Sequence, residues 1–376
     1  MDALEELIKL AGDITSPSVA EWKDGGRKIV GFFCSYVPEE VLHAAGILPC
    51  RVRAPGCAVT TEADVYLSHL NCTYMRACLQ FALDGRYNHL DGLVFTNSCD
   101  HVRRVYDILR EVRPDDYPLL HMISIPHKSD EDLIAWFGEE LDAFKEKIEH
   151  TFGVEITDEG LRDAIGVYND SRDLLRQLYD LRKGDRPPIN GVETLKVILA
   201  GYCLPRERYN GLLRRLLGEL ESRQGISGYR ARLMIAGSGG FDDPAYIDVM
   251  EELGGLVVTD SLCFGSRGFW EPVSVDGDPM LAIARAYLER PSCPRMVDKV
   301  VERVDFVKRM VADFRVDGVV FQRMRYCDLW GGQLLYLEKE LNEAGIPLLS
   351  LEREYAMGGA GQLRTRVQAF LERIEE

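Results

Sequence analysis

The fold is decided by a short stretch that occurs twice, Leu90-Asp91-Gly92-Leu93-Val94-Phe95 and Val316-Asp317-Gly318-Val319-Val320-Phe321. Cys99-Asp100 follows the first copy after three residues, and Cys327-Asp328 follows the second copy after five residues. An apolar run behind Asp-Gly is typical of a buried strand, and each copy then enters a segment with helical spacing. Each of these helices leads to a proline-led apolar run. We interpret the pattern as a divergent internal repeat that places a Cys-Asp pair at the end of a strand in each half.

The rest of the chain alternates between strand and helix patterns, which is typical of parallel sheets. Strands are expected near 28–34, 47–53, 90–96, 118–125, 231–237, 255–259, 317–322 and 347–351. Helices are expected near 38–45, 63–84, 100–112, 244–253, 278–289, 295–314, 328–344 and 360–375. The middle, from 129 to 223, lacks a strand pattern, and its Leu/Arg-rich runs predict two or three long helices broken at Pro187-Pro188.

A chain of 376 residues exceeds the usual size of one domain. We therefore predict an α/β protein with two open parallel-sheet lobes. The N-terminal lobe is expected over 1–128, a helical connecting segment over 129–228 and the C-terminal lobe over 229–376.

Composition narrows the class of protein. The apolar fraction of 46% and the charged fraction of 28% are those of a globular protein. The net charge of −16 argues against a nucleic-acid-binding surface, which needs a basic stripe. No apolar run approaches the roughly 20 residues that span a bilayer. The acidic start Met1-Asp2-Ala3-Leu4-Glu5-Glu6 is unlike a signal peptide, so we expect a cytoplasmic protein.

Ten cysteines call for a chemical explanation. Disulfides are disfavoured in a reducing cytosol, so metal binding or catalysis is the better hypothesis, with roughly half of the cysteines serving as small buried hydrophobes. Cys99 and Cys327 sit where a strand stops and a helix starts, the end of an open sheet at which ligands bind. A helix N-terminus there favours a thiolate and an anionic cluster. Asp100 and Asp328 are expected to be helix caps or first-turn acids.

A third thiolate is expected from Asn71-Cys72-Thr73-Tyr74-Met75-Arg76-Ala77-Cys78. On one helix, Cys72 and Cys78 point about 120° apart, so one can ligate while the other packs. Cys34 and Cys263 also end strands, and Cys293 lies in a loop; for each of these a structural role is the favoured interpretation.

Other motifs point away from nucleotide chemistry. Gly237-Ser238-Gly239-Gly240 follows a strand, but Asp242 stands where a dinucleotide loop has its third glycine. The chain contains no GxxxxGK[ST] loop and is not expected to hydrolyse ATP itself. A lone histidine is usually structural, but His101 follows Cys99-Asp100 closely enough to donate a hydrogen bond to the sulfurs of a cluster.

Taken together, these motifs resemble the 2-hydroxyacyl-CoA dehydratase/benzoyl-CoA reductase family. The similarity covers nearly the whole chain and rests on Gly31-Phe32-Phe33-Cys34-Ser35-Tyr36-Val37-Pro38-Glu39-Glu40-Val41-Leu42-His43-Ala44-Ala45-Gly46, Cys72-Thr73-Tyr74-Met75-Arg76, Ser98-Cys99-Asp100, Asp260-Ser261-Leu262-Cys263-Phe264-Gly265-Ser266-Arg267, Tyr326-Cys327-Asp328 and Gly361-Gln362-Leu363-Arg364-Thr365-Arg366-Val367-Gln368-Ala369-Phe370.

The resemblance implies two flavodoxin-like lobes with a 4Fe–4S cluster between them, held by Cys72, Cys99 and Cys327. It also implies an acyl-CoA substrate, a dimer with a related or identical subunit, and a separate ATP-dependent iron–sulfur activator that injects one electron. Water would then leave from a ketyl radical anion, assisted by an iron site that lacks a fourth cysteine. Ser35 matches a position near the substrate and would donate a hydrogen bond to the thioester; alternatively, it is a turn or capping residue ahead of the helix that Pro38 opens.

Three further possibilities stay open at this point. One is an aromatic-ring reductase of the benzoyl-CoA type. Another is a reductase with an 8Fe double-cubane cluster, for which Cys34, Cys78 and Cys263 would supply extra thiolates. The last is a supporting subunit without a catalytic role.

Overall fold

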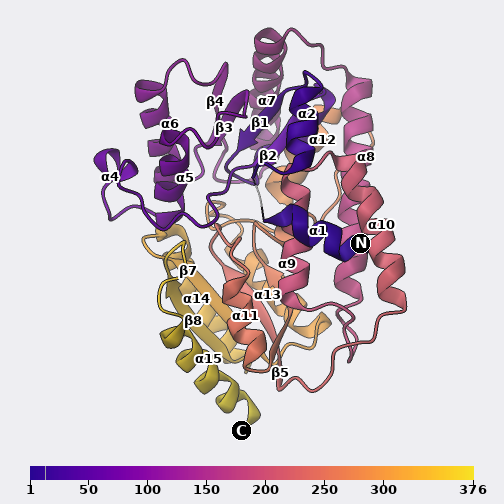
Figure 1. The fold of residues 1–376 in the computed structure, drawn as a ribbon, viewed down its shortest axis with the longest axis vertical. Coiled ribbons are helices and arrows are strands. Elements are labelled where there is room, and N and C mark those ends of the chain that lie inside the picture. Colours follow the sequence, from indigo (N-terminus) through magenta and orange to yellow (C-terminus); the bar gives the residue numbers. More distant parts are fainter. Residues whose placement is uncertain (13) are drawn as a thin grey trace.

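Two parallel four-stranded sheets form the frame of the protein, in a computed structural model that describes residues 1–12 and 14–376 (Figure 1). The first sheet has the order β2-β1-β3-β4 and the second has the order β6-β5-β7-β8. The strands of the first sheet are β1 (Ile29–Phe32), β2 (Leu48–Arg51), β3 (Gly92–Thr96) and β4 (Leu119–Ile123). Those of the second are β5 (Ala231–Gly237), β6 (Gly255–Ser261), β7 (Gly318–Met324) and β8 (Leu348–Arg353). The two orders are equivalent, which confirms the predicted α/β class with two lobes.

The repeated Asp-Gly has a structural role at the start of the third strand of each lobe. The backbone N–H of Ile29 donates to the Asp91 carboxylate at 3.0 Å, and the Asp91 N–H donates back to the Ile29 carbonyl at 2.7 Å. In the second lobe, Arg232 and Asp317 exchange the same two bonds at 2.7 and 2.8 Å. Each aspartate therefore fixes the start of its strand against the neighbouring strand.

The glycine after each aspartate allows close packing. A Cβ at Gly92 would lie 2.7 Å from the carbonyl oxygen of Leu119, and one at Gly318 would lie 2.7 Å from the ring of Phe370. Both distances are too short for a methyl group, so only glycine fits at these positions without a shift of the neighbours.

The helix expected over 63–84 is wrong as a single element. It consists of α4 (Ala63–Tyr66) and α5 (Thr73–Leu83), with a turn between them. In that turn the Ser68 carbonyl accepts the backbone and side-chain N–H groups of Asn71 at 2.9 and 3.0 Å, and the Ser68 hydroxyl accepts the Leu70 N–H at 3.2 Å. Such local bonds compete with the helix ladder. Cys72 consequently precedes α5 instead of lying inside a helix.

The remaining helices of the first lobe are α3 (Glu39–Ala44) and α6 (Asp100–Val112), both near their expected positions. Two N-terminal helices, α1 (Ala3–Ala11) and α2 (Pro17–Asp24), were not expected; α1 packs against the connecting helices α9 and α10.

The connecting segment holds four helices instead of two or three: α7 (Glu131–Phe152), α8 (Asp158–Asp180), α9 (Gly191–Ala200) and α10 (Arg206–Glu221). Gly153, with a φ of 67°, ends α7. Asn190 and Glu193 form a capping box at the start of α9. A 3₁₀ turn, η1 (Gly201–Cys203), separates α9 from α10. Figure 1 shows these helices along one side of both sheets.

The second half contains α11 (Ala245–Glu252), η2 (Ser266–Gly268), α12 (Pro279–Glu289), α13 (Val300–Asp313), α14 (Asp328–Glu343) and α15 (Ala360–Glu375). The helix α13 begins five residues later than expected. The helix α12 packs against α7 and α8, and its Ile283 is buried in one cluster with Val30 and Val94 of the first sheet. A segment of the second half therefore covers a face of the first lobe.

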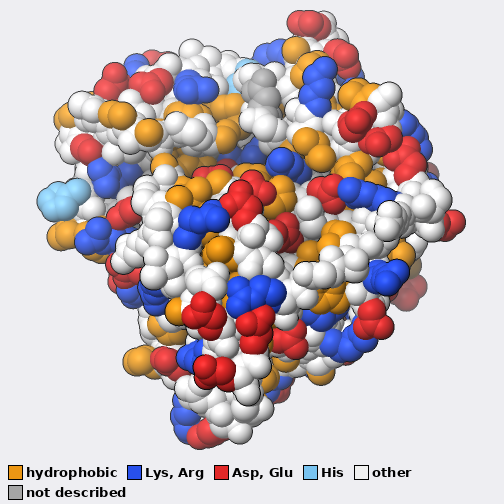
Figure 2. Space-filling view, turned by 60° about the horizontal axis from the view of Figure 1, so that its bottom comes forward, with side chains coloured by type: hydrophobic (Ala, Val, Ile, Leu, Met, Phe, Trp, Pro, Cys, Tyr) orange, Lys and Arg blue, Asp and Glu red, His pale blue; other side chains and the backbone are white. Residues whose placement is uncertain are grey.

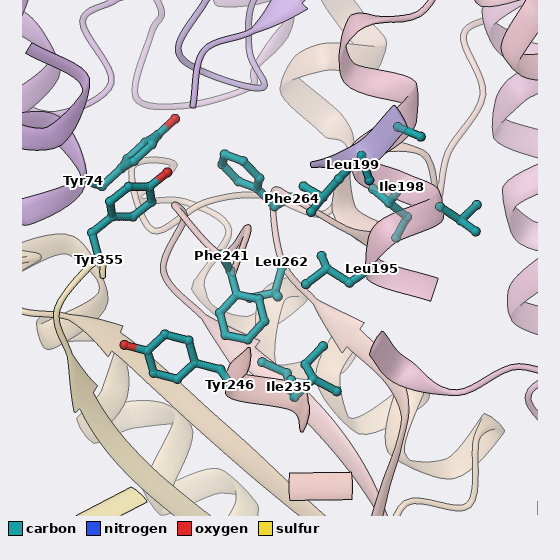
Figure 3. Close-up of a cluster of buried hydrophobic side chains, with 14 of the residues drawn as sticks. Tyr74, Leu195, Ile198, Leu199, Ile235, Phe241, Tyr246, Leu262, Phe264 and Tyr355 are labelled. Carbon is teal, nitrogen blue, oxygen red and sulfur yellow. The ribbon is translucent and has the colours of Figure 1, made fainter. Parts of the chain in front are cut away.

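The lobes share a buried core. Tyr74 of α5, Phe264 after β6 and Tyr355 after β8 belong to one buried cluster with Leu195 and Ile198 of α9, and Phe264 lies between the two tyrosines and the α9 side chains (Figure 3). Tyr74 crosses Phe264 edge-on at 6.0 Å and lies 5.1 Å from Tyr355, measured between ring centroids. Aromatic packing of this kind fixes one lobe against the other.

Charged side chains of both signs are mixed on the face of the molecule in Figure 2. Acidic and basic side chains alternate there and form no large patch of one charge. Among the helices of the described residues, none combines the length and apolar character needed to cross a bilayer.

Candidate functional site

Cys72, Cys99 and Cys327, hereafter the central thiols, occupy the same kind of position on three helices. Each is the N-cap residue, of α5, α6 and α14 respectively. A backbone N–H of the first turn lies near each sulfur and lowers the thiol pKa; these amides belong to Met75, Val102 and Trp330. Helix N-termini favour negative charge, so all three positions suit a thiolate ligand.

The structure brings these three cysteines together from both lobes. Burial is the main reason that their pKa values are raised, to about 12 for Cys99. A negative charge on Cys72 further raises the pKa of both Cys99 and Cys327, so the three sulfurs lie within electrostatic reach of one another. Without a positive partner they are therefore thiols, and a metal that binds them must displace their protons.

The spacing of the central thiols does not match a site for one ion. Among the described residues, no three His, Cys, Asp or Glu side chains are grouped closely enough to hold a single metal ion. Each iron of a cubane takes its own thiolate, so cluster ligands stand farther apart than the ligands of one ion.

His101 connects the loops that carry all three central thiols. Its Nδ1 lies 3.0 Å from Oδ1 of Asn71, the neighbour of Cys72. Its Nε2 lies 2.9 Å from the carbonyl oxygen of Tyr326, the neighbour of Cys327, and therefore donates to it. Tyr326 has a φ of 65°, a conformation that few residues other than glycine adopt. Both ring nitrogens thus face protein groups, Nε2 the Tyr326 carbonyl and Nδ1 the Asn71 side-chain amide, instead of cluster sulfurs.

Two more cysteines, Cys34 and Cys293, lie near Cys99, and Cys263 lies near Cys293. Negative charge on Cys34 and Cys293 raises the pKa of Cys99, and charge on Cys34 and Cys263 raises that of Cys293. Cys293 is a loop residue without a ligand-like spacing, so nothing in the sequence signalled that it reaches the site.

Cys34 differs from the other buried thiols. Burial raises its pKa, but the Arg51 guanidinium and the Tyr36 N–H, together with two nearby hydroxyls, outweigh that effect and lower it below its ordinary value. Cys78 behaves in the opposite way: it is fully buried inside α5, beside Tyr87, and burial raises its pKa well above the ordinary value. The structure therefore places Cys78 in the core of the lobe.

Ser35 lies in the turn between β1 and α3 and lines a cavity of about 60 Å³ with Arg51 and Cys263. Its carbonyl accepts a hydrogen bond from Arg290. The N-cap of α3 is Pro38, so Ser35 does not cap that helix.

Two buried arginines near the thiols have nitrogen atoms without a partner. Arg51 and Arg267 are each 4% exposed. Nε of Arg51, and Nε and Nη2 of Arg267, have no hydrogen-bond partner within the part of the chain that the structure describes. Buried cations need a compensating negative charge, so this environment suits an anionic occupant.

Two parallel-sheet lobes whose helix N-caps present cysteines to one another define a two-lobed α/β protein with a thiol site between its halves. The family model "2-hydroxyglutaryl-CoA dehydratase, D-component" matches residues 34–374. The chain belongs to that family.

Individual relatives extend over almost the full chain. A benzoyl-CoA reductase subunit of Thauera aromatica is 26% identical over 381 residues, covering 100% of this chain and 98% of the relative. The beta subunit of lactoyl-CoA dehydratase from Anaerotignum propionicum is 23% identical and covers 100% of both chains. The beta subunit of (R)-2-hydroxyglutaryl-CoA dehydratase from Acidaminococcus fermentans is 25% identical, covering 99% of this chain and 98% of the relative. Relatives with both dehydratase and reductase names are thus similar to this chain.

Proposed function

We propose that the chain is the iron–sulfur subunit of a 2-hydroxyacyl-CoA dehydratase-type enzyme, a lyase that eliminates water from a CoA thioester. In this proposal Cys72, Cys99 and Cys327 hold a 4Fe–4S cluster. The observation that carries it is the meeting of three thiols from two lobes, each at the N-cap of a helix. The dehydratase names of two relatives support the reaction class.

The residues present fit such a cluster. Three thiolates leave one iron of a cubane without a cysteine, and the helix N-termini favour the negative charge of the group. The unpartnered nitrogens of Arg267 supply positive charge near Cys293. When bound, a cluster of this type provides one-electron chemistry and, at the iron without a cysteine, a Lewis acid.

The chain itself contributes binding and orientation. Ser35 faces the cavity beside Cys263, and its hydroxyl would donate a hydrogen bond to the thioester oxygen of the acyl-CoA substrate. His101 holds the cysteine loops of the two lobes in register. In this proposal Ser35 contacts the substrate, whereas His101 positions the cysteine ligands.

The proposal also names the partner proteins and the cellular compartment. Because the relatives are named as subunits, we propose a dimer with a related or identical subunit. Since the sequence has no phosphate-binding GxxxxGK[ST] loop, ATP-dependent activation is assigned to a separate iron–sulfur protein. An anaerobic cytoplasm is the proposed location. We also propose 1–128 and 229–376 as the lobes and 129–228 as the connector, with α12 covering the first lobe.

A second candidate function is a reductase with an 8Fe double-cubane cluster. The observation that favours it is the position of Cys34 and Cys293 near Cys99, with Cys263 near Cys293, since more iron needs more thiolates. In this alternative Cys293 takes the place that the sequence gave to Cys78.

Iron and acid-labile sulfide analysis of the anaerobically purified chain tests both proposals. About four irons per chain supports the dehydratase type, about eight supports the double cubane, and no iron overturns both. A second assay adds a 2-hydroxyacyl-CoA, the partner subunit, the activator and ATP. Turnover is expected only with the complete mixture, and turnover by the chain alone would contradict the electron-injection model.

A further inference from the structure

The cavity beside Ser35 is lined by four parts of the chain. The turn after β1 and the end of β2 form one wall, the connecting helices α8–α10 with η1 form another, and the loop from Cys263 to Phe269 and the end of α12 complete it. Its volume of about 60 Å³ admits about four to six non-hydrogen atoms, because one water needs roughly 10–15 Å³ by the same measure. The cavity therefore suits a small molecule or the end of an acyl chain, and is too small for a CoA nucleotide.

Arg51 brings to this cavity a positive charge that forms no ion pair with a carboxylate of the described residues. Its Nη2 lies 4.0 Å from the sulfur of Cys263, and its guanidinium lies 4.6 Å from the ring centroid of Phe264. Within the described ranges, 1–12 and 14–376, it forms no ion pair with a carboxylate, and its Nε has no partner. Truly isolated charges are expensive to bury, so a partner outside the chain is expected.

The carboxylates at the cavity are bound to other arginines, although Glu39 also lies within electrostatic reach of Arg51. Glu39 binds Arg206 at 2.5 Å, and the buried Glu40 behind it binds Arg172 at 2.5 Å. Each carboxylate is therefore already used. Arg290 donates to the Ser35 carbonyl and lies 4.2 Å from the ring centroid of Tyr287, with no carboxylate partner among the described residues. The cavity is left with a surplus of positive charge.

We propose that this cavity is a binding site for a small carboxylate, with Arg51 as its charge partner and Ser35 on the adjacent wall. Arginine matches a carboxylate because its planar fork donates two parallel hydrogen bonds. The inference concerns the cavity that the proposed function gives to the acyl group and rests on that function for the acyl-CoA source, whereas anion binding itself requires only the cavity and its charges. The carboxylate can belong to a free short-chain acid or to the far end of an acyl group on CoA.

Isothermal titration of the anaerobically purified full-length chain tests the site. Acetate and propionate are compared with acetamide and propionamide, which have nearly the same shape without the charge. Saturable binding of the acids, at least tenfold tighter than of the amides, is expected. Equal affinity for acids and amides would overturn the proposal.

Matched variants locate the binding. Arg51→Met should weaken acetate binding at least tenfold, whereas Glu39→Gln should strengthen it, because it removes the carboxylate that competes for Arg206. Arg53→Met is the control: Arg53 is 2% exposed, lies 3.9 Å from Asp242 and does not line this cavity. Unchanged acetate affinity in both Arg51→Met and Glu39→Gln would overturn the assignment, and Glu39→Gln keeps it testable if Arg51→Met does not fold.

Two further measurements distinguish a free acid from the end of an acyl chain, and the anion site from the proposed function. Tighter binding of succinyl-CoA than of butyryl-CoA identifies the end of an acyl chain as the occupant; equal binding of the two, with acetate still bound, identifies a free acid. Iron analysis of the same samples is independent of anion binding. A chain that binds acetate but carries no iron would refute the proposed function and leave the anion site standing.

Discussion

The two lobes use one scaffold in nearly the same way at their third strands. Cys99 follows the end of β3 at Thr96 with two residues between them, and Cys327 follows the end of β7 at Met324 with the same two-residue gap. In the sequence, the distance from the repeated stretch to its cysteine is two residues longer in the second lobe. The two extra residues belong to β7, which is longer than β3 and pairs with β8 as far as Arg353. The repeat is therefore closer in structure than in sequence.

The lobes differ at their first strands. Two residues after the end of β1 stands Cys34, and two residues after the end of β5 stands Gly239. A Cβ at Gly239 would lie 3.0 Å from the sulfur of Cys263. The first lobe thus carries the thiol of Cys34 at this position, whereas the second lobe has a glycine that leaves space for the thiol of Cys263, just after β6. The two lobes thus have the same strand order but different side chains at the ends of their first strands, and this difference makes the thiol site asymmetric.

The largest effect is expected when the equivalent cysteines are changed. Cys99→Ser and Cys327→Ser should each lose most of the visible cluster absorbance and iron, because each removes a thiolate ligand. Cys78→Ser, within α5, is the control and should retain iron. Full iron content in either Cys99→Ser or Cys327→Ser would show that the lobes do not contribute equivalent ligands.

Alanine at the repeated glycines should separate the lobes by stability. Gly92→Ala meets the backbone of β4, which cannot move aside, whereas Gly318→Ala meets only the ends of the Phe370 and Ile374 side chains. Overpacking costs about 1–3 kcal/mol, and we expect the upper end for Gly92→Ala and the lower end for Gly318→Ala. Urea unfolding of both variants measures the difference, and equal losses would mean that the Leu119 backbone can adjust.

A change at His101 should loosen the connection between the lobes. His101→Phe removes both hydrogen bonds to the cysteine loops, and a loss of about 1–2 kcal/mol in the free energy of unfolding is expected. Asn71→Ala removes only one of them and should cost less. Electron paramagnetic resonance of the reduced protein should also change in His101→Phe, and an unchanged spectrum together with unchanged stability would contradict the role given to this residue.

The smallest effect concerns pH and Asp91. Burial raises the pKa of this carboxyl, but Lys23, the Ile29 N–H and Lys28 outweigh burial and lower it below the ordinary value. Its contribution to stability is therefore present above the unfolded-state pKa of about 3.9 and is lost as the pH falls through the lower folded-state pKa. The free energy of unfolding, measured by urea from pH 7 to pH 3, should fall less steeply in Asp91→Asn. An identical pH dependence in both proteins would show that Asp91 does not contribute.

Much of the fold could be predicted because it depends on local patterns. All eight strands lie at their expected positions, and Asp100 and Asp328 are first-turn acids as expected. The break before α5 was missed because a side-chain turn at Ser68 overrides an otherwise helical pattern. The connector was undercounted because a capping box at Asn190 starts a helix that the Leu/Arg-rich runs did not mark.

The sequence by itself determined the two sheets, their repeat and the cysteines at the exits of β3 and β7, since strand periodicity and Asp-Gly turns act over a few residues. Only the tertiary structure decided which other side chains meet them. His101 and Tyr326 are 225 residues apart in the chain, and Cys293 comes to Cys99 from a loop without a pattern of its own. That Arg51 forms no ion pair with a carboxylate of the described residues is likewise a property of its surroundings, because an ion pair depends on distances in space that spacing along the chain does not fix.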